Sequence, residues 1–449
     1  MSEYALRIVV EKVDLADEEN ILSRETLTKI DINSPDNIID LGLRHGAQID
    51  ILRMLQDKLI KEQATFLKPK TRCCSACNSD LVGNGYATSK FHAVFTDHEI
   101  KVQKLKCLNC KKSVVPSVKS LLGTSIHPDL YRIQCEQGAN HTYRKAEHTL
   151  EQMCNNKRDI NNHNRIKNIT NAVGKALAEK NKTVDESLVV DQAKELIIQV
   201  DGGHIKTNES EKRSIEVMSA KVYRPESLVA ITETRSKIKA RGCAASARYD
   251  KQSSMKKYIK TAASYQGLSP ETRITGLADG AKNCWSLIKS LEKSCGSLEC
   301  ILDWFHIAKK FEPAIKSASK KTSSLLKKSK AYFWDGNAEQ GLAVLTDLIA
   351  TLDPSDIKSK VVGIHSYVKR NKEYIADYSS KAKNEKPYTS QVAESTVEHL
   401  INDRQKRSQK MQWSREGAHN VLQIRASMAS NRWEMEWQDM VFKAIKLAA

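Results

Sequence analysis

The pattern of apolar and polar positions divides the chain into an N-terminal part and a C-terminal part that begins near Lys194. From Asp40 to Phe66 apolar residues recur at helical spacing, with lysine and arginine between them, which predicts a helix. Residues before Asp40 are weakly patterned, so we assign 1–66 to an N-terminal helical region. Between Thr71 and Pro116 the pattern changes to short β-like runs such as HAVF and EIKVQKL.

Helical spacing returns between Tyr143 and Gly174. The stretches TYRKAEHTLEQMC and NHNRIKNITNAVGKAL are separated by the polar break NNKRDINN. This outline is typical of a helix-turn-helix whose second helix is basic enough to enter a DNA groove. A small helical hairpin without DNA contacts has the same outline. We assign residues 130–190 to a helix-turn-helix DNA-binding domain.

From Lys194 onward the apolar runs have the length of strands, and three of them run into an aspartate. ELIIQVDGGHIK contains Asp201, TRITGLADG ends at Asp279-Gly280, and LECILDWFHI contains Asp303. SIEVMSAKVYR and SLVAITETR are two further strand-like runs, and SSMKKYIKTAASYQGL and AKNCWSLIKSLEK are predicted helices. The pattern predicts a mixed α/β unit with three carboxylates at or near strand ends.

The segment from Ala308 to Ser380 is patterned almost entirely as helix, beginning with the lysine-rich run KKFEPAIKSASKKTSSLLKKSK. After the loop KAKNEKPYTSQ, another helix is predicted from Ala393 to about Gln409. We therefore expect one α/β domain at 194–449, interrupted by a helical insertion at about 308–385.

The charge of the chain indicates a polyanionic partner. Lysine plus arginine number 72 against 54 aspartate plus glutamate, which gives a net charge of +18 and a pI near 9.3. An excess of this size favours nucleic acid, because each phosphate contact releases a counterion; a basic but inert surface and a membrane-surface protein are the alternatives. No apolar run approaches the ~18 residues of a membrane span. The first residues, MSEYALRIVV, lack a basic region followed by a long apolar stretch, so no secretory signal is visible in them. We expect a cytoplasmic protein.

Five of the 11 cysteines gather between Cys73 and Cys110. The pairs Cys74-x-x-Cys77 and Cys107-x-x-Cys110 have the spacing of two zinc knuckles, and four thiolates close a tetrahedral shell. Such a closed site is structural, so we expect one structural Zn²⁺ in a zinc-ribbon domain at 67–120. Ligation through Cys73 in place of Cys74 and two incidental pairs are the alternatives.

Three carboxylates are candidates for a second metal site. Asp201 and Asp279 follow buried strand-like runs, and Glu394 lies at the start of the predicted helix after the insertion. Converging carboxylates repel one another unless cations lie between them. Hard oxygen ligands suit two Mg²⁺ or Mn²⁺ ions, which stabilise the attacking and leaving oxygens at phosphorus. An Asp-Gly pair after a strand is otherwise an ordinary turn.

The motifs ELIIQVDGGHIK, ITGLADGAKNCWSLI, ECILDWFHIAKKF, SQVAESTVEHLINDRQK and MQWSREGAHNVLQIRA, in this order, resemble the insertion-sequence DDE transposases. The ISKra-type and ISL-type groups are the most similar, and the Mutator-like families are more distant. The resemblance covers about 194–437. It implies an RNase H-like catalytic core in which Asp201, Asp279 and Glu394 bind the catalytic metal ions.

The resemblance also implies supporting residues. Asp303 and His306 form the family's Asp-x-x-His element, and Trp413 belongs to its closing block. Core roles are the alternatives for His306 and Trp413. Glu398, four residues beyond Glu394, is a rival third carboxylate. The family's glycine-rich stretch before the glutamate is absent here.

We therefore expect a bacterial, nucleoid-associated transposase that binds the terminal repeats of a mobile element and catalyses metal-dependent cleavage and transfer of DNA strands. Joining two element ends to target DNA requires at least a homodimer in the DNA complex. A non-catalytic DNA-binding protein derived from a transposase is the principal alternative. A host nuclease that recognises DNA shape is another.

Overall fold

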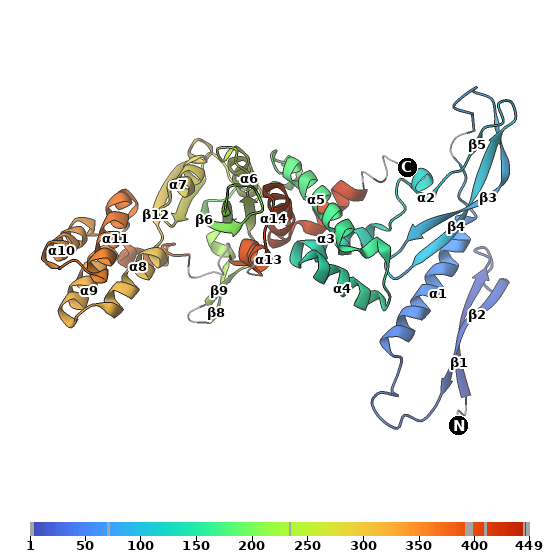
Figure 1. The fold of residues 1–449 in the computed structure, drawn as a ribbon, viewed down its shortest axis with the longest axis horizontal. Coiled ribbons are helices and arrows are strands. Elements are labelled where there is room, and N and C mark those ends of the chain that lie inside the picture. The colour runs from blue at the N-terminus through green and yellow to red at the C-terminus, as the bar shows by residue number, and fades with distance from the viewer. Residues whose placement is uncertain are drawn as a thin grey trace. The chain divides into compact units, whose positions relative to one another are not determined.

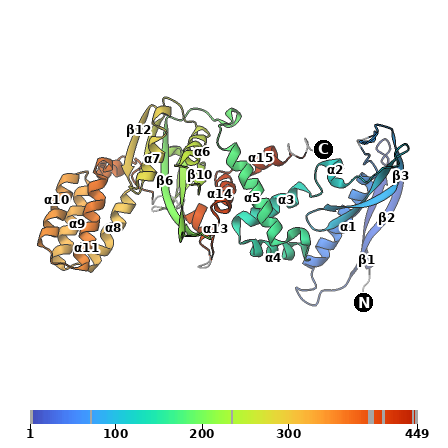
Figure 2. The same cartoon turned by 45° about the horizontal axis from the view of Figure 1, so that its top comes forward.

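A computed structural model describes residues 4–69, 72–232, 235–390, 398–407, 411–442 and 445 (Figures 1 and 2). The chain forms two compact units, which we describe separately. The first comprises Met1–Ile169 together with Trp437–Ala449, and the second comprises Thr170–Glu436.

The first unit begins with a β-hairpin and a long helix. Strands β1 (Tyr4–Val13) and β2 (Ile21–Ile32) pair antiparallel, and helix α1 spans His45–Ala64. The prediction of a helical region over 1–66 is therefore wrong for the hairpin. Most side chains of both strands are exposed or half-buried, so these strands lack the clean alternation that identifies a strand with one buried face.

A three-stranded antiparallel sheet follows, in the order β3-β4-β5. Ile100 and Val102 of β4 pack with Val118 of the short helix α2 and with Ile60 of α1. This small core fixes α1 against the sheet. The bounds of the elements are β3 Leu81–His92, β4 Asp97–Cys107, β5 Ser113–Val114 and α2 Val118–Leu122.

Three helices complete the described part of this unit before the boundary at Ile169: α3 (Pro128–Asn140), α4 (Tyr143–Cys154) and α5 (His163–Lys180), the last of which continues beyond it. The two helices predicted on either side of the polar break are α4 and α5. Thr142 caps the start of α4 by accepting from Lys145 N, and Asn155 ends it in the left-handed conformation.

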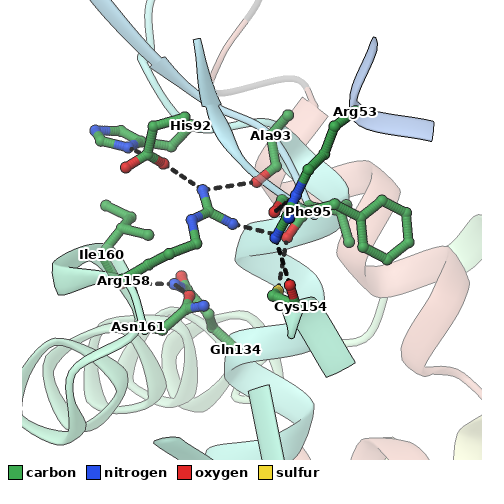
Figure 3. Close-up of polar contacts among 11 residues, drawn as sticks. Arg53, His92, Ala93, Phe95, Gln134, Cys154, Arg158, Ile160 and Asn161 are labelled. Atoms are coloured by element: carbon green, nitrogen blue, oxygen red, sulfur yellow. Dashed lines mark hydrogen bonds and ion pairs between the residues drawn. The ribbon is translucent and has the colours of Figure 1, made fainter. Parts of the chain in front are cut away.

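A buried arginine joins the sheet to these helices (Figure 3). Arg158, in the break between α4 and α5, donates to the carbonyls of Ala93 (3.0 Å) and Val94 (2.8 Å) and forms an ion pair with Asp97. His92 Nδ1 lies 2.8 Å from the same Asp97 carboxylate. The turn between β3 and β4 is thus held by charge-assisted hydrogen bonds rather than by apolar packing alone.

The second unit is built on a five-stranded mixed sheet in the order β10-β7-β6-β11-β12. Strand β7 is antiparallel to β6 and β10, whereas β11 is parallel to β6 and β12. The bounds of the strands are β6 Glu195–Lys206, β7 Ser214–Tyr223, β10 Gly242–Ser246, β11 Arg273–Ala278 and β12 Ser297–Leu302.

The run SLVAITETR does not contribute to this sheet. It forms β8 (Leu228–Thr232) and the start of β9 (Arg235–Ile238), which make a separate two-stranded hairpin. The third strand of the central sheet is instead β10, a five-residue strand of small residues that is buried throughout.

Helices cover both faces of the sheet. In β10, Ala244 belongs to the buried cluster that contains the apolar face of α6, whereas Cys243 and Ala245 belong to the cluster that contains α14, as the alternation of side chains along a strand requires. The bounds of these helices are α6 Ser253–Ser264, α7 Lys282–Lys289 and α14 Arg415–Ala429.

The segment after β12 is helical, as its pattern predicts. Its apolar side chains continue the core of the sheet, because Phe311, Leu345 and Val368 belong to the same buried cluster as Leu277 and Ile301. The helices are α8 Trp304–Ser317, α9 Lys320–Trp334, α10 Ala338–Thr351, α11 Asp356–Arg370 and α12 Tyr378–Lys383.

The remaining described elements are short. Five 3-10 helices lie at Asp159–Asn161, Glu186–Leu188, Pro225–Ser227, Glu292–Ser294 and Lys372–Tyr374. Towards the C-terminus are the π-helix Glu398–Asn402, α13 (Asp403–Gln405), α15 (Trp433–Trp437) and the π-helix Gln438–Phe442. Within the described residues, no helix combines the length and the apolar character needed to cross a membrane.

Candidate functional site

The four predicted zinc ligands converge at one end of the β3-β4-β5 sheet. The Sγ atoms of Cys74, Cys77, Cys107 and Cys110 all lie within 4.8 Å of one another, with Cys74 to Cys110 at 3.5 Å and Cys77 to Cys107 at 3.4 Å. Four thiolates around one zinc ion lie about 3.8 Å apart at Zn–S bonds of about 2.3 Å. The cluster could therefore hold zinc, and Cys73 lies outside it.

Two tight turns present these cysteines. In the first, Asn78 N donates to Cys74 O (2.8 Å), and in the second, Cys107 N donates to Lys112 O (2.9 Å). Asn78 and Lys111, each directly after the second cysteine of its knuckle, have left-handed backbone. The Ser79 hydroxyl and backbone N–H lower the pKa of Cys77 to about 6, which favours the thiolate that binds metal.

Three aspartates occupy equivalent positions on adjacent parallel strands. The pairing of β11 ends at Ala278, opposite Val200 of β6 and Leu302 of β12. The next residue on each strand is Asp201, Asp279 or Asp303. Strand β6 does not end there, because it continues to Lys206 in pairing with β7 alone. Asp201 thus marks the point at which β6 loses its parallel neighbour.

Asp201 and Asp279 are both half-buried, and the carboxylate of each accepts a hydrogen bond from a nearby backbone N–H. Asp201 Oδ1 accepts from Gly202 N (2.7 Å), and Asp279 Oδ1 accepts from Ala281 N (2.9 Å). Burial raises the pKa of Asp201, and the charges of Asp279 and Asp303 raise it further. The aspartates therefore share one electrostatic field, in which a bound cation would relieve their repulsion.

The third predicted carboxylate, Glu394, lies outside the described residues. Its rival Glu398 is exposed and accepts from Asn402 Nδ2 (2.7 Å). Beyond Glu398, Leu400 and Ile401 are buried in the α14 layer, as the predicted apolar face requires. Among the described residues, the four cysteines are the one group of three or more potential ligands within 4.8 Å, and Asp201 and Asp279 do not belong to such a group.

Asp303 is almost fully buried and bonded on both oxygens. Oδ1 accepts from Phe305 N (3.0 Å), which caps α8, and from Ser390 N (3.1 Å). Oδ2 accepts from the Ser390 hydroxyl and from His306 Nδ1 (3.0 Å). With four donors around it, Asp303 fixes the segment before Glu394 against the end of β12.

His306 lies beside the aspartates and is hydrogen-bonded to Asp303. Burial lowers the pKa of the imidazole, but the hydrogen bond and charge of Asp303, together with the charges of Asp201 and Asp279, outweigh burial and raise it overall. The side chain remains 26% exposed. His306 is therefore neither an ordinary core histidine nor a free surface group.

Trp413 is a core residue. Its indole Nε1 donates to Gln405 O (3.2 Å), and its backbone bonds to Lys206 and Thr207, which lie at the end of β6. The guanidinium of Arg404 lies 4.7 Å from the ring centroid and is buried, so it is not available to bind DNA phosphates. Trp413 thus supports the strand that carries Asp201.

Arg425 supports the region after Glu394 from α14. It is buried and donates to Leu400 O (3.0 Å) and His399 O. Both carbonyls belong to the π-helix that begins at Glu398.

Two residues at the C-terminal end of α11 contact the Asp279 turn, and sequence reasoning missed both. Tyr367 donates its hydroxyl to Asp279 O (2.8 Å). Gly280 has φ +92°, and a Cβ there would lie 2.6 Å from Asn371 Nδ2. Asn371 in turn accepts from Trp285 Nε1 (3.2 Å). These contacts join residues more than 80 positions apart, so no local pattern could reveal them.

Comparison with known proteins supports a family assignment. The search of curated proteins returned no match. The profile described as uncharacterised protein family UPF0236 matches residues 124–440, which include the aspartates, the helical segment and the closing block but not the four cysteines. Because this match covers more than half of the chain, the protein belongs to that family.

Proposed function

We propose that the second unit is the catalytic domain of a DDE-type transposase, which cuts and joins DNA strands. The observation that carries the proposal is the register of the parallel strands. It places Asp201 and Asp279 side by side, one residue beyond the paired positions Val200 and Ala278. In α/β proteins, active sites lie beyond the carboxyl ends of such strands.

The topology of the sheet supports an RNase H-like core. Counted from β6, the strand order is 3-2-1-4-5, and only the second strand runs antiparallel to the rest. The resemblance to DDE transposases implies such a core. In this sheet Asp201 lies on the first strand, and Asp279 directly follows the fourth.

The tether on Asp303 supports Glu394 as the third carboxylate. Ser390 is bonded to Asp303, which neighbours Asp279 across the sheet. Glu394 follows Ser390 by four residues, and four residues span at most about 14 Å. We therefore propose Glu394, rather than the exposed Glu398, as the third carboxylate.

Asp201, Asp279 and Glu394 would hold two Mg²⁺ or Mn²⁺ ions, since carboxylate oxygens are the ligands that these ions prefer. Bound there, the ions would activate the attacking oxygen and stabilise the leaving oxygen at phosphorus. Asp303 and Ser390, which are hydrogen-bonded to each other, would help to position the third carboxylate. When protonated, His306, hydrogen-bonded to Asp303, would add positive charge beside the scissile phosphate.

The first unit would recognise DNA. Its zinc ribbon and the helices α4 and α5 would bind the terminal repeats, and the net charge of +18 favours such a partner. Cleaving two ends and joining them to a target requires at least two copies of the chain in the DNA complex. Such a protein would act in the bacterial cytoplasm, at the nucleoid.

The test is cleavage of DNA that carries the inverted repeats flanking the gene, with Mg²⁺ present. Wild type should cut it, and Asp201→Asn and Asp279→Asn should lose at least about a hundredfold in rate, as when an essential electrostatic group is removed. Asp356→Asn, at an exposed aspartate of α11, serves as the control and should cut normally. Equal rates in all variants would refute the mechanism, and DNA binding without any cleavage would favour a non-catalytic protein derived from a transposase.

A further inference from the structure

The exposed face of α8 is strongly basic, and the helix begins directly after Asp303. From Trp304 to Lys330 the chain has eight lysines and one acidic residue, Glu312. On α8, the exposed Lys309, Lys310 and Lys316 lie with His306 within an arc of about 120°. The opposite side of the helix is buried in the core through Ile307, Phe311 and Ala314.

These three lysines differ from other lysines of the same helical segment. Lys360 pairs with Asp356 (2.7 Å), Lys381 with Glu299 (2.7 Å) and Lys372 with Glu339. Within the described part of the chain, no carboxylate lies within ion-pair distance of Lys309, Lys310 or Lys316. Their positive charge is therefore not neutralised by the protein itself.

Aromatic rings orient two of the ammonium groups. Lys310 Nζ lies 4.5 Å from the centroid of Tyr367, whose hydroxyl donates to Asp279 O. Lys309 Nζ lies 5.6 Å from the centroid of Phe305. A ring beneath an ammonium group restrains the side chain without cancelling its charge. Lys310 is thus held close to the loop that carries Asp279.

We propose that Lys309, Lys310 and Lys316, the α8 lysine track, bind the phosphates of the DNA strand as it leaves the carboxylate site. The substrate class rests on the proposed function. From His306 to Lys316 the helix rises about 15 Å, and one strand of duplex DNA carries a charge every 3.4 Å or so. The track is therefore long enough to follow about four phosphates beside the cut.

The test measures how the affinity of the full chain for a random-sequence DNA duplex falls with salt, in buffer without added divalent ions. The variant Lys309→Gln/Lys310→Gln/Lys316→Gln should reduce the slope of log affinity against log salt by about 2.7, at about 0.9 for each phosphate that the variant no longer neutralises. Lys316→Gln alone should give about a third of that effect.

The control, Lys360→Gln/Lys372→Gln/Lys381→Gln, removes the same charge from the same helical segment. It should leave the slope close to that of wild type, because its lysines pair with acids. An unchanged slope in the track variant, or an equal reduction in the control, would overturn the inference. Because no cleavage is involved, a reduced slope in a chain that cuts no DNA would support the track and count against the proposed nuclease.

Discussion

Replacing Asp303 by asparagine tests whether this residue fixes the end of β12 to α8 and to Ser390. The amide oxygen can still accept from Phe305 N and Ser390 N. The amide nitrogen cannot accept, so the two charge-assisted hydrogen bonds that Oδ2 receives from His306 Nδ1 and the Ser390 hydroxyl are lost; the hydroxyl can at most rotate to accept a weaker, neutral bond from the amide.

The expected loss of stability follows from those two bonds. Hydrogen bonds to a charged group contribute about 1.5–3 kcal/mol each. Part of this is recovered, because a buried amide loses less solvation than a buried carboxylate. The net decrease in unfolding free energy should be about 2–4 kcal/mol, or a fall in Tm of about 5–15 °C for a unit of this size. Asp356→Asn, at an exposed ion pair, should cost about 1 kcal/mol or less.

The pH dependence gives an independent readout. The pKa of His306 is raised in the folded protein, so its protonation stabilises the fold fully below its unfolded pKa of about 6.5, and the effect is lost as pH rises through the higher folded value. In Asp303→Asn the negative charge that raises the pKa of His306 is gone, whereas burial still lowers it, so the pKa of His306 should fall. The stability gap between wild type and Asp303→Asn should therefore be widest at pH 5–6.5 and should narrow above it.

Two measurements test this reasoning. Thermal unfolding across pH gives the stability gap, and NMR titration gives the His306 midpoint, with its resonances identified among the 12 histidines through a His306→Gln variant. The reasoning fails if the His306 midpoint in Asp303→Asn equals that of wild type, or if the stability gap does not vary with pH.

Three other outcomes are expected. The purified chain should contain about one zinc ion per molecule, and Cys77→Ser should abolish it; metal analysis that finds no zinc in wild type would exclude the site. Arg158→Met removes the hydrogen bonds to the Ala93 and Val94 carbonyls and the ion pair with Asp97, which keeps His92, so unfolding of the first unit should become easier by about 2–4 kcal/mol, which calorimetry would measure. In the DNA cleavage assay, Glu394→Gln should lose activity whereas Glu398→Gln should retain it, and the reverse result would identify Glu398 as the third carboxylate.

The central strands could be predicted because each carries a short, mainly apolar run. Those runs lead into Asp201, Asp279 and Asp303, and parallel pairing then aligns the three residues. The knuckle cysteines could be predicted equally well, since metal geometry dictates their spacing. The apolar strands and the cysteine spacing can be recognised in the sequence because each depends on residues that are close together in the chain.

Other elements could not be predicted. Strand β10 has only five small residues without β-branched side chains, and its strand character comes from burial between two layers of helices. The strand-like run from Ser227 has better β-formers but forms a side hairpin. The Asp303–Ser390 tether joins positions 87 residues apart, and nothing in either local sequence identifies the partner.

The way α11 meets the Asp279 turn limits how this protein can be shortened. Excision of 308–385 would leave every strand of the sheet in the sequence. It would remove the Tyr367 hydroxyl that donates to Asp279 O, the Asn371 amide that accepts from Trp285, and the apolar side chains that share a core with β11 and β12. We expect such a truncated chain to aggregate, because the excision would expose buried apolar side chains of the domain core to solvent.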